Sequence, residues 1–460
     1  MVNRYNIRDR FAVVLIVFLL SLSGQVRGQV SAQVKQTAVI RDAATNVRLP
    51  SQVRIQQTAN GAVYRVVVKN AGAADSAVYN VFIPEGVDTV RGVFIHQHGC
   101  GMEGRGVSSA YDVQYQAFAK KWRLAIVGPD LYYKSGCYEW RDPESGSGPS
   151  LLTAFEKIGK ASNHPELKDS PWLLWGHSGG GYWVLAMMKN YPARILAAFC
   201  YSPAFDPSWD YPEEALKIPV MIRHAGANDS NSPNGKCWET AINSFHKLRS
   251  AGGLASITYT PYQNHNYSFV RYMAIPFYES VLAKRLPKGE AVSFKALRDI
   301  DKSGSWLGDT LLLNTYKYTG YPKKRRELSW LPDSVTAAKW KEYSITGTVV
   351  DRTPPPAPYG LERKRLHNVA VELRWKADAD IESGIKHFNI YKGSQLIARF
   401  PRHGVYQRFD TNGDDAIPMS DLPEMKTVVI LPVGEHKDIT VSTVNHFDLE
   451  SPKMTVPAFE

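Results

Sequence analysis

The chain has 460 residues, of which 44% are hydrophobic and 22% charged. These proportions are ordinary for globular proteins, and they argue against a disordered chain, a collagen-like repeat or a polytopic membrane protein. The 55 Lys and Arg residues against 44 Asp and Glu residues give a formal charge of +11. This excess is modest, and the sequence lacks the aromatic-basic signature of an RNA-binding module, so nucleic acid is not an expected partner.

The first 32 residues resemble an export signal. The basic residues Arg4, Arg8 and Arg10 precede an apolar run over residues 11–22, and small residues follow up to Gly28 and Ala32. An apolar run of about 12 residues is short for a span of ~30 Å, whereas it suits a cleavable signal. We therefore expect a signal peptide over residues 1–32, a secreted or periplasmic protein, and no membrane span in the mature chain. The alternative is an anchor that stays attached.

Short apolar segments organise the next part of the chain. Residues 53–55, 64–68 and 79–83 are β-branched and separated by turns, which predicts an antiparallel entry to a sheet. Uninterrupted apolar runs then alternate with helical patterns, and such runs are typical of parallel strands buried on both faces. The expected strands lie near 93–95, 124–127, 172–175, 195–200, 220–222 and 257–259, and the expected helices near 111–121, 150–160, 179–190, 237–250 and 268–286. The pattern predicts an α/β domain, which we place at residues 33–290.

The last third of the chain divides in two. Trp306, Trp330 and Trp340 indicate that residues 291–350 pack on the preceding domain as an extension. The prolines at 354–356 favour an extended boundary segment. Alternating segments near 371–375, 388–391, 428–430 and 439–441 then predict an all-β sandwich over residues 351–460.

The sharpest motif is Gly176-His177-Ser178-Gly179-Gly180, a G-x-S-x-G sequence between a predicted strand and a predicted helix. A sharp strand-to-helix turn exposes the serine hydroxyl, and small residues on either side keep the turn free of collisions. The context therefore favours a nucleophile elbow with Ser178 as nucleophile over a glycine-rich structural turn.

A serine hydroxyl needs a base to take its proton. On a sheet of this kind the acid and then the histidine follow the serine along the chain. Asp229 and His265 each follow a predicted strand in this order, so we expect them to complete a triad. Their alternative role is hydrogen bonding within loops. The competing residues are Asp206, Asp210, His224 and His246, of which His246 falls inside a predicted helix and His224 precedes Asp229.

Two N–H groups must face the negative charge that develops during acyl transfer. We expect one from Gly179 and the other from Cys100 or Gly101, in a glycine-containing loop after the strand near 93–95. His96 and His98 in the same region lack a complementary ligand pattern, so we expect them to shape the loop. We expect neither a metal nor an organic cofactor.

Together these residues resemble the α/β-hydrolase superfamily, and within it the secreted esterases that include polyhydroxybutyrate-depolymerase-like, feruloyl and acetylxylan esterases. The likeness covers about residues 50–286 and rests on His98-Gly99-Cys100, on Cys137-Tyr138-Glu139-Trp140, and on the triad residues. The elbow has His177-Ser178-Gly179 where that group more often has Leu-Ser-Ala or Leu-Ser-Ser. The C-terminal segment resembles a fibronectin type III module in its Thr-Pro-Pro opening and in Leu373-Arg374-Trp375.

Four cysteines allow three pairings, and an exported chain meets oxidising conditions. We expect Cys100–Cys137 and Cys200–Cys237, because each pair would join loops on the face where the site is built. Four buried free thiols are the alternative.

These features predict a secreted serine hydrolase that cleaves carboxylic esters through an acyl-enzyme, with a polymer-linked or polysaccharide-linked ester as substrate. A serine peptidase on the same fold is one alternative. A non-catalytic surface-binding protein on a hydrolase scaffold is another.

Overall fold

A computed structural model describes residues 53–69, 74–102, 104–229, 237–266, 268–289, 292–321, 325–407, 423–431 and 438–458. The predicted signal peptide lies outside these residues. The described residues belong to one compact unit, Leu49–Glu460. Within them, no helix combines the length and the apolar character that a membrane crossing needs.

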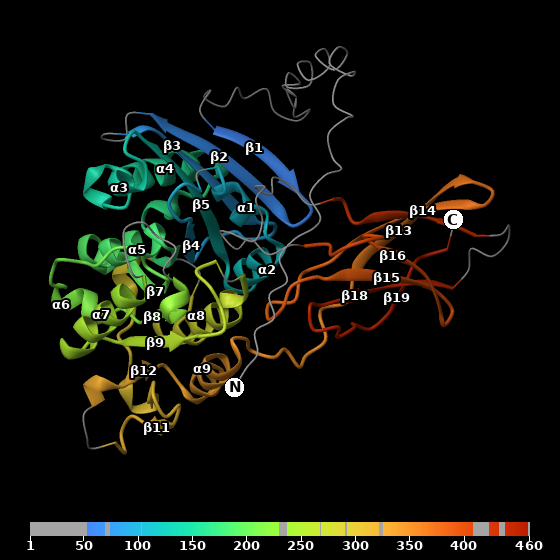
Figure 1. Ribbon diagram of the computed structural model, residues 1–460. Helices are drawn as coiled ribbons and strands as arrows, with labels where there is room; N and C mark the ends of the chain where they lie inside the picture. The colour runs from blue at the N-terminus through green and yellow to red at the C-terminus, as the bar shows by residue number, and fades with distance from the viewer. Residues whose placement is uncertain are drawn as a thin grey trace, which may run out of the picture. The chain divides into compact units, whose positions relative to one another are not determined.

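A nine-stranded sheet in the order β1-β2-β3-β5-β4-β6-β7-β8-β9 forms the centre of the first part of the chain (Figure 1). Its strands are β1 (Val53–Thr58), β2 (Gly61–Lys69), β3 (Ala74–Pro84), β4 (Gly92–Gln97), β5 (Leu124–Tyr133), β6 (Trp172–His177), β7 (Ile195–Tyr201), β8 (Val220–His224) and β9 (Ala255–Tyr259).

The first three strands are antiparallel, as the sequence predicted, and β3 also runs antiparallel to β5. From β5 to β9 all neighbours are parallel. The chain crosses over so that β4 lies between β5 and β6, which places the ends of β4 and β6 side by side. This order, with helices on both faces, is that of the α/β-hydrolase fold.

Helices cover both faces of this sheet. They are α1 (Gly106–Tyr111), α2 (Val113–Trp122), α3 (Cys137–Trp140), α4 (Ser147–Ser162), α5 (Gly179–Asn190), α6 (Glu213–Leu216), α7 (Cys237–Ser250) and α8 (Arg271–Arg285). The helices predicted from the sequence are present, and α7 has the predicted bounds.

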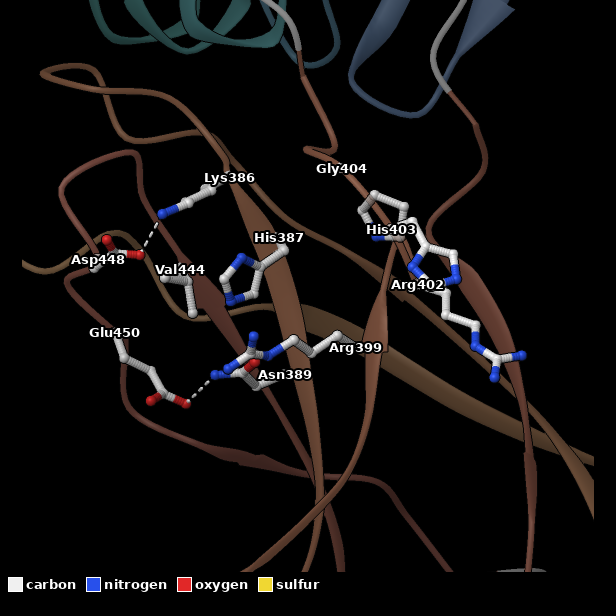
Figure 2. A pocket seen from close by; sticks show the side chains of 11 residues that line it. Lys386, His387, Asn389, Arg399, Arg402, His403, Gly404, Val444, Asp448 and Glu450 are labelled. Atoms are coloured by element: carbon white, nitrogen blue, oxygen red, sulfur yellow. Dashed lines mark hydrogen bonds and ion pairs between the residues drawn. The ribbon is translucent and has the colours of Figure 1, made fainter.

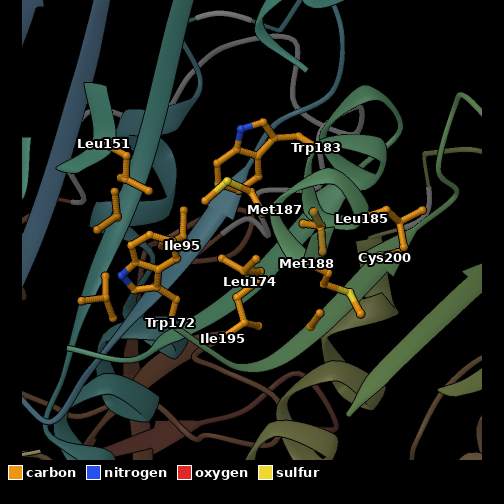
Figure 3. Packing of buried hydrophobic residues seen from close by; sticks show 14 of the residues in the cluster. Ile95, Leu151, Trp172, Leu174, Trp183, Leu185, Met187, Met188, Ile195 and Cys200 are labelled. Carbon is orange, nitrogen blue, oxygen red and sulfur yellow. The ribbon is translucent and has the colours of Figure 1, made fainter. Parts of the chain in front are cut away.

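Alternate residues of one strand enter different cores. Trp172 and Leu174 of β6 belong to a cluster with α4 and α5, as Figure 3 shows, whereas Leu173 and Trp175 belong to a cluster with α2 and α8. Every residue of β6 is buried. This two-sided burial explains why the strand is an uninterrupted apolar run in the sequence.

The extension covers the outer strand of the sheet. It contains β10 (Trp306–Gly308), β11 (Thr315–Lys317), β12 (Ser329–Leu331) and helix α9 (Ser334–Thr346), which the sequence analysis did not predict. Trp330 and Trp340 are fully buried, and Trp306 is partly buried. The amide of Ile257 in β9 donates to Ser329 Oγ at 3.0 Å, and Trp340 Nε1 donates to the carbonyl oxygen of Ile257 at 2.8 Å. Side chains of the extension therefore satisfy backbone groups that an edge strand would leave open.

The C-terminal part is all-β, as predicted. A three-stranded sheet holds β13 (Tyr359–His367), β14 (Ala370–Lys376) and β17 (Lys426–Ile430), and a four-stranded sheet holds β16 (Gln395–Phe400), β15 (His387–Lys392), β18 (Ile439–Val444) and β19 (Met454–Thr455). Trp375 and Phe388, one from each sheet, pack with ring centroids 5.2 Å apart. The two sheets therefore share a core, which is the arrangement of a β-sandwich.

One of the two predicted disulfides is wrong. The structure joins Cys100 to Cys137, whereas Cys200 and Cys237 are buried free thiols. Cys200 lies within β7, opposite Ile222 of β8, while Cys237 begins helix α7, which packs on β8 and β9. The sequence predicted that both cysteines lie at the same edge of the sheet. Because α7 packs on β8 and β9, however, Cys237 does not pair with Cys200 in β7. Burial raises the pKa of both thiols, that of Cys237 to about 12.

Candidate active site

Ser178 occupies the turn between β6 and α5. Its φ is +54° and its ψ is −116°, a conformation that is costly for a residue with a side chain. The turn is held by the amide of Ser178, which donates to the carbonyl oxygen of Tyr201 at 2.8 Å. The Ser178 carbonyl in turn accepts from the amide of Gly181 at 2.9 Å. This strained turn between a strand and a helix is the backbone geometry that the G-x-S-x-G motif predicts.

The glycines of the motif are required by space. A Cβ on Gly176 would lie 2.1 Å from the carbonyl oxygen of Gly180, and a Cβ on Gly180 would lie 2.5 Å from that of His98. Both distances are well inside van der Waals contact. The glycines therefore allow α5 to begin directly against the ends of β4 and β6.

Asp229 ends the 3-10 turn Gly226–Asp229, which follows β8, and it is fully buried. Its Oδ1 accepts from Ser202 Oγ at 2.8 Å and lies 3.9 Å from Arg223 Nη1, and its Oδ2 accepts from the amide of Ala225. Burial by itself would raise the pKa of Asp229. The hydrogen bond to His265 and the charge of Arg223 outweigh it, so the pKa is lowered and the carboxylate is ionised at neutral pH.

His265 follows β9 and meets this carboxylate. Its Nδ1 lies 3.3 Å from Asp229 Oδ1. An ionised carboxylate can only accept, so Nδ1 carries a hydrogen and donates a hydrogen bond to Asp229, and the other ring nitrogen, Nε2, is not used by this contact. The structure therefore brings two of the three predicted triad residues into direct contact.

His177, which precedes the serine, ties the elbow to the same loop. It is 1% exposed, its Nε2 donates to the carbonyl oxygen of His265 at 3.0 Å, and the two rings lie 4.6 Å apart between centroids. Burial lowers the pKa of His177 well below its usual value, so its ring is neutral. The main chain of His265 is thereby fixed beside the residue that adjoins Ser178.

The loop after β4 packs on the first residue of α5. A Cβ on Gly179 would lie 2.3 Å from Cys100 Sγ and 3.5 Å from the Cys100 amide nitrogen. A Cβ on Gly101 would have no atom within 4 Å, so this residue does not pack on the elbow. Of the two residues predicted to give the second amide, Cys100 is therefore the one beside Gly179. Its disulfide to Cys137 fixes it to α3.

The other acidic and histidine candidates point elsewhere. Asp206 accepts from Asn243, Asp210 pairs with Lys247 at 3.3 Å, and His224 stacks on Tyr259 with ring centroids 5.0 Å apart. His246 lies in α7, as expected. None of these contacts leads to His265.

His96 and His98 have roles in packing. The His96 ring stacks on Trp175 with centroids 3.9 Å apart, and its Nδ1 bonds Ser109 Oγ at 2.8 Å. His98 lies edge-on to Trp140, with centroids 5.3 Å apart. These contacts fix the loop that carries Cys100.

Among the described residues, one cluster has the ligand types of a metal site, namely Asp351, Asp380 and Glu382, whose oxygens lie within 4.8 Å of one another. It belongs to the C-terminal part of the chain. Asp351 Oδ2 accepts from Ser383 at 2.6 Å and Asn445 at 2.9 Å, while burial and the charge of Asp351 raise the pKa of Asp380 to about 7. Hydrogen bonds to Asp351 and the raised pKa of Asp380 thus explain how these carboxyl groups can lie close together.

Three aromatic rings surround Arg141 next to the elbow. Its guanidinium carbon lies 3.7 Å from the centroid of Phe205, 4.9 Å from that of Tyr182 and 5.2 Å from that of Tyr138. Tyr182 is four residues after Ser178 on α5, and Tyr138 is 53% exposed.

The aromatic side chains near the elbow differ in exposure. Trp140 and Trp183 are buried in the core and cannot meet a substrate, whereas Tyr182 packs with Trp209 at 5.2 Å between centroids. Tyr138 belongs to the Cys137–Trp140 motif on which the family resemblance rests, and the exposure of its side chain could not be read from that short motif.

Arg223, Ser202 and His177 were not assigned a role from the sequence. Arg223 is 0% exposed, and its Nη1 donates to Ser202 Oγ at 3.2 Å and to the carbonyl oxygen of Asn264 at 3.0 Å. A charged residue at the end of an apolar strand was a signal that could have found it. Ser202 has a φ of +46°, which the sequence does not reveal.

Comparisons with known proteins find likeness in structure alone. No protein-family model matches the chain, and no curated protein is similar to it. Poly(aspartic acid) hydrolase-1 from Sphingomonas sp. KT-1 is 15% identical, with a TM-score of 0.35 over 44% of this chain and 93% of that one. An S-formylglutathione hydrolase from Agrobacterium tumefaciens is 15% identical, with a TM-score of 0.36 over 51% of this chain and 100% of that one. The acetyl xylan esterase from Aspergillus awamori is 12% identical, with a TM-score of 0.30 over 40% of this chain and 80% of that one. At these scores the matches do not identify a reaction for this chain.

Proposed function

We propose that this chain is a serine hydrolase of carboxylic esters, with Ser178 as nucleophile, His265 as base and Asp229 as the residue that orients the base. The observation that carries the proposal is the contact of His265 with an ionised, buried Asp229, at the sheet edge where Ser178 stands on a strained turn. A hydroxyl, a carboxylate and an imidazole on the loops after β6, β8 and β9 are the groups that acyl transfer needs.

The contact between His265 and Asp229 determines which atoms transfer protons in the proposed reaction. Because Nδ1 of His265 is held by Asp229, Nε2 is available to take the proton of Ser178 as its oxygen attacks the ester carbonyl. The protonated ring then gives the proton to the departing alcohol. In the second half, Nε2 takes a proton from the water that attacks the acyl-serine. As the bond between the acyl carbon and Ser178 Oγ breaks, the ring returns that proton to Oγ and the acid is released. Asp229 remains a carboxylate throughout and stabilises the imidazolium.

The amides of Gly179 and Cys100 are proposed to hold the oxyanion. Gly179 is the first residue of the 12-residue helix α5, so its amide has no partner within the helix. A Cβ on Gly179 would lie 3.5 Å from the Cys100 amide nitrogen, which supports Cys100 as the second donor. Donors fixed in this way stabilise the tetrahedral intermediate without having to reorient during the reaction. We propose no metal or organic cofactor for this chemistry.

The proposed substrate is an ester linked to a polymer or a polysaccharide. The half-exposed ring of Tyr138 beside Tyr182 and Phe205 offers a surface on which a sugar or an aromatic acid could stack. Export by the signal over residues 1–32 would bring the enzyme to such material outside the cytoplasm. We retain residues 33–290 as the catalytic domain and 291–350 as its extension. The order of strands in the two C-terminal sheets supports a fibronectin type III-like module over residues 351–460.

The proposal is tested by ester turnover and by labelling. The wild-type chain should hydrolyse p-nitrophenyl acetate and be labelled by a fluorophosphonate at Ser178. Ser178→Ala should lose the label and turnover by a factor on the order of 10⁴. Ser250→Ala, which changes an exposed serine at the end of α7, serves as the matched control and should keep both. Asp229→Asn and His265→Ala should also cripple turnover.

Three results would overturn the proposal or part of it. If Ser178→Ala kept more than roughly a tenth of the wild-type activity, the elbow would not supply the nucleophile. Faster cleavage of a peptide p-nitroanilide than of any ester would favour a serine peptidase. Absence of both turnover and labelling in the wild-type chain would favour a binding protein that retains the hydrolase scaffold.

A further inference from the structure

Arg141 is a cation without a counter-ion beside the elbow. It directly follows α3, and its guanidinium lies among the rings of Phe205, Tyr182 and Tyr138. Within the part of the chain that the structure describes, no carboxylate pairs with this guanidinium and no group accepts a hydrogen bond from it. The rings attract the positive charge, but they give its N–H groups no acceptor. An anionic partner is therefore missing from the protein itself.

The acidic residues next to Arg141 in the sequence are engaged with main-chain groups. Glu139 Oε2 accepts from the amide of Ser135 at 3.2 Å. Asp142 Oδ1 accepts from the amide of Glu144 at 3.1 Å. Neither carboxylate forms an ion pair with Arg141, so the charge of Arg141 is not neutralised by its own segment.

Two of the three rings are tied to the main chain of the proposed nucleophile. The amide of Tyr182 donates to the carbonyl oxygen of Ser178 at 3.2 Å. The amide of Ala204, which directly precedes Phe205, donates to the same carbonyl oxygen at 3.0 Å. The two rings that contact Arg141 most closely therefore stand on residues fixed to the elbow.

The third ring stands beside the first proposed oxyanion donor. Tyr138 follows Cys137, and a Cβ on Gly179 would lie 3.6 Å from the Cβ of Cys137. The amide of Arg141 donates to the carbonyl oxygen of Cys137 at 3.2 Å, so Arg141 belongs to the same turn. The guanidinium is thus held between the elbow and the turn that the disulfide joins to the oxyanion loop.

One edge of the guanidinium is open to solvent. Nη1 of Arg141 is buried without a hydrogen-bond partner. Nε and Nη2 also have no partner among the described residues, but they are not buried. The Tyr138 ring is exposed, and Tyr182 and Phe205 are only partly buried, so the rings do not close off this edge. Two N–H groups on one edge of a guanidinium are the donors that hold both oxygens of a carboxylate.

We propose that Arg141 binds a carboxylate of the substrate, so that the preferred esters carry a free carboxylate near the bond that is cleaved. This inference rests on the proposed function and names a substrate class for it. Tyr182 lies four residues after Ser178, which is about 6 Å along α5, so only a few bonds separate the carboxylate from the ester. A neutral substrate would cover the guanidinium and leave its open edge without an acceptor.

Two pairs of esters test the proposal, and the members of each pair differ only in a carboxylate replaced by a carboxamide. The p-nitrophenyl esters of adipic acid and of its half-amide carry this group on the acyl side. The acetates of 4-hydroxybenzoate and of 4-hydroxybenzamide carry it on the alcohol side. In at least one pair, the wild-type chain should have a KM about tenfold lower for the carboxylate than for the carboxamide.

Arg141→Gln should remove this preference. It should raise KM for the preferred carboxylate by about tenfold or more and change kcat by less than about threefold, because the ion pair forms equally in the bound substrate and in the transition state. Its kcat/KM for the carboxamide should change by less than about threefold, which also shows that the variant is folded. Arg141→Lys keeps the charge but not the paired N–H groups, so it should recover only part of the loss.

Arg402→Gln is the matched control, because it removes the same charge far from the elbow in sequence. Arg402 is exposed and lines a cavity of about 530 Å³ in the C-terminal part, where its side chain points away from Arg399 (Figure 2). This variant should change kcat/KM for the carboxylates by less than about twofold.

Three results would overturn the inference while the proposed function stands. They are turnover without a preference for the carboxylate in either pair, an equal loss on carboxylate and carboxamide in Arg141→Gln, and an equal loss in Arg402→Gln. The second would show that Arg141 serves only the packing of the three rings, and the third would show attraction by net charge. If the wild-type chain hydrolyses none of these esters and no p-nitrophenyl acetate, the proposed function fails and the inference fails with it.

Discussion

The Cys100–Cys137 bridge should stabilise the fold and support turnover, and the two effects can be separated. The bridge closes a loop with a sequence separation of 37 residues. In the chain-entropy description, a loop of that length removes unfolded-state freedom worth about 4 kcal/mol near room temperature. Replacing both cysteines by serine should therefore lower the free energy of unfolding by about 2–4 kcal/mol, measured by urea denaturation followed through tryptophan fluorescence.

Turnover should fall at urea concentrations where the bridge-free variant is still folded. Cys100 lies against Gly179, so loss of the bridge frees the loop that carries one proposed oxyanion donor. Removal of one such donor costs a factor on the order of 10²–10³ in turnover, and a loosened donor should cost less than that.

The chain contains its own control for this experiment. Cys200→Ala combined with Cys237→Ala removes two buried thiols that close no loop. Its cost should come from packing alone, and turnover should be retained. The reasoning fails if the Cys100/Cys137 variant loses under about 1 kcal/mol, or if the Cys200/Cys237 variant behaves in the same way. Peptide mapping under non-reducing conditions should find one bridge and two free thiols.

Two further predictions concern buried charges. Arg223→Met should cost about 3–5 kcal/mol of unfolding free energy, because it leaves the buried Asp229 carboxylate without its cation, and the exposed Arg374→Gln should cost under about 0.5 kcal/mol. The pKa of Asp229 is lower in the folded chain than in the unfolded chain, so ionised Asp229 stabilises the fold above its unfolded-state pKa, and this contribution is lost as pH falls through the folded-state pKa. Arg223→Met should raise the folded-state pKa, so the variant should lose this contribution at a higher pH than the wild type. The pH dependence that Asp380 contributes has the opposite sign, because burial and the neighbouring Asp351 raise its pKa from 3.8 to about 7 in the folded chain. Protonated Asp380 therefore stabilises the fold fully below its unfolded-state pKa, and this contribution is lost as pH rises toward 7. The difference corresponds to at most about 4 kcal/mol, and Asp380→Asn should flatten thermal stability between about pH 4 and pH 7; an unchanged slope would contradict the assignment.

The sequence by itself determined the framework of this protein. Strands buried on both faces must be apolar at every position, so the run at 172–175 could be recognised without a partner strand. The turn at Ser178 was recognisable for a similar reason, since only small residues fit where Gly176 and Gly180 meet other backbones. Order along the chain sufficed to nominate Asp229 and His265.

Only the tertiary structure decided which side chains meet. Helix α7 was predicted with its observed bounds, but its seat over β8 and β9 is set by packing between distant segments, and that seat keeps Cys237 from Cys200. The contact of His177 with the main chain of His265 joins residues 88 positions apart, and no local pattern encodes it. Local spacing fixes strands, helices and turns because it acts through neighbouring residues, whereas charge pairing and disulfide geometry depend on positions that only the packed chain defines.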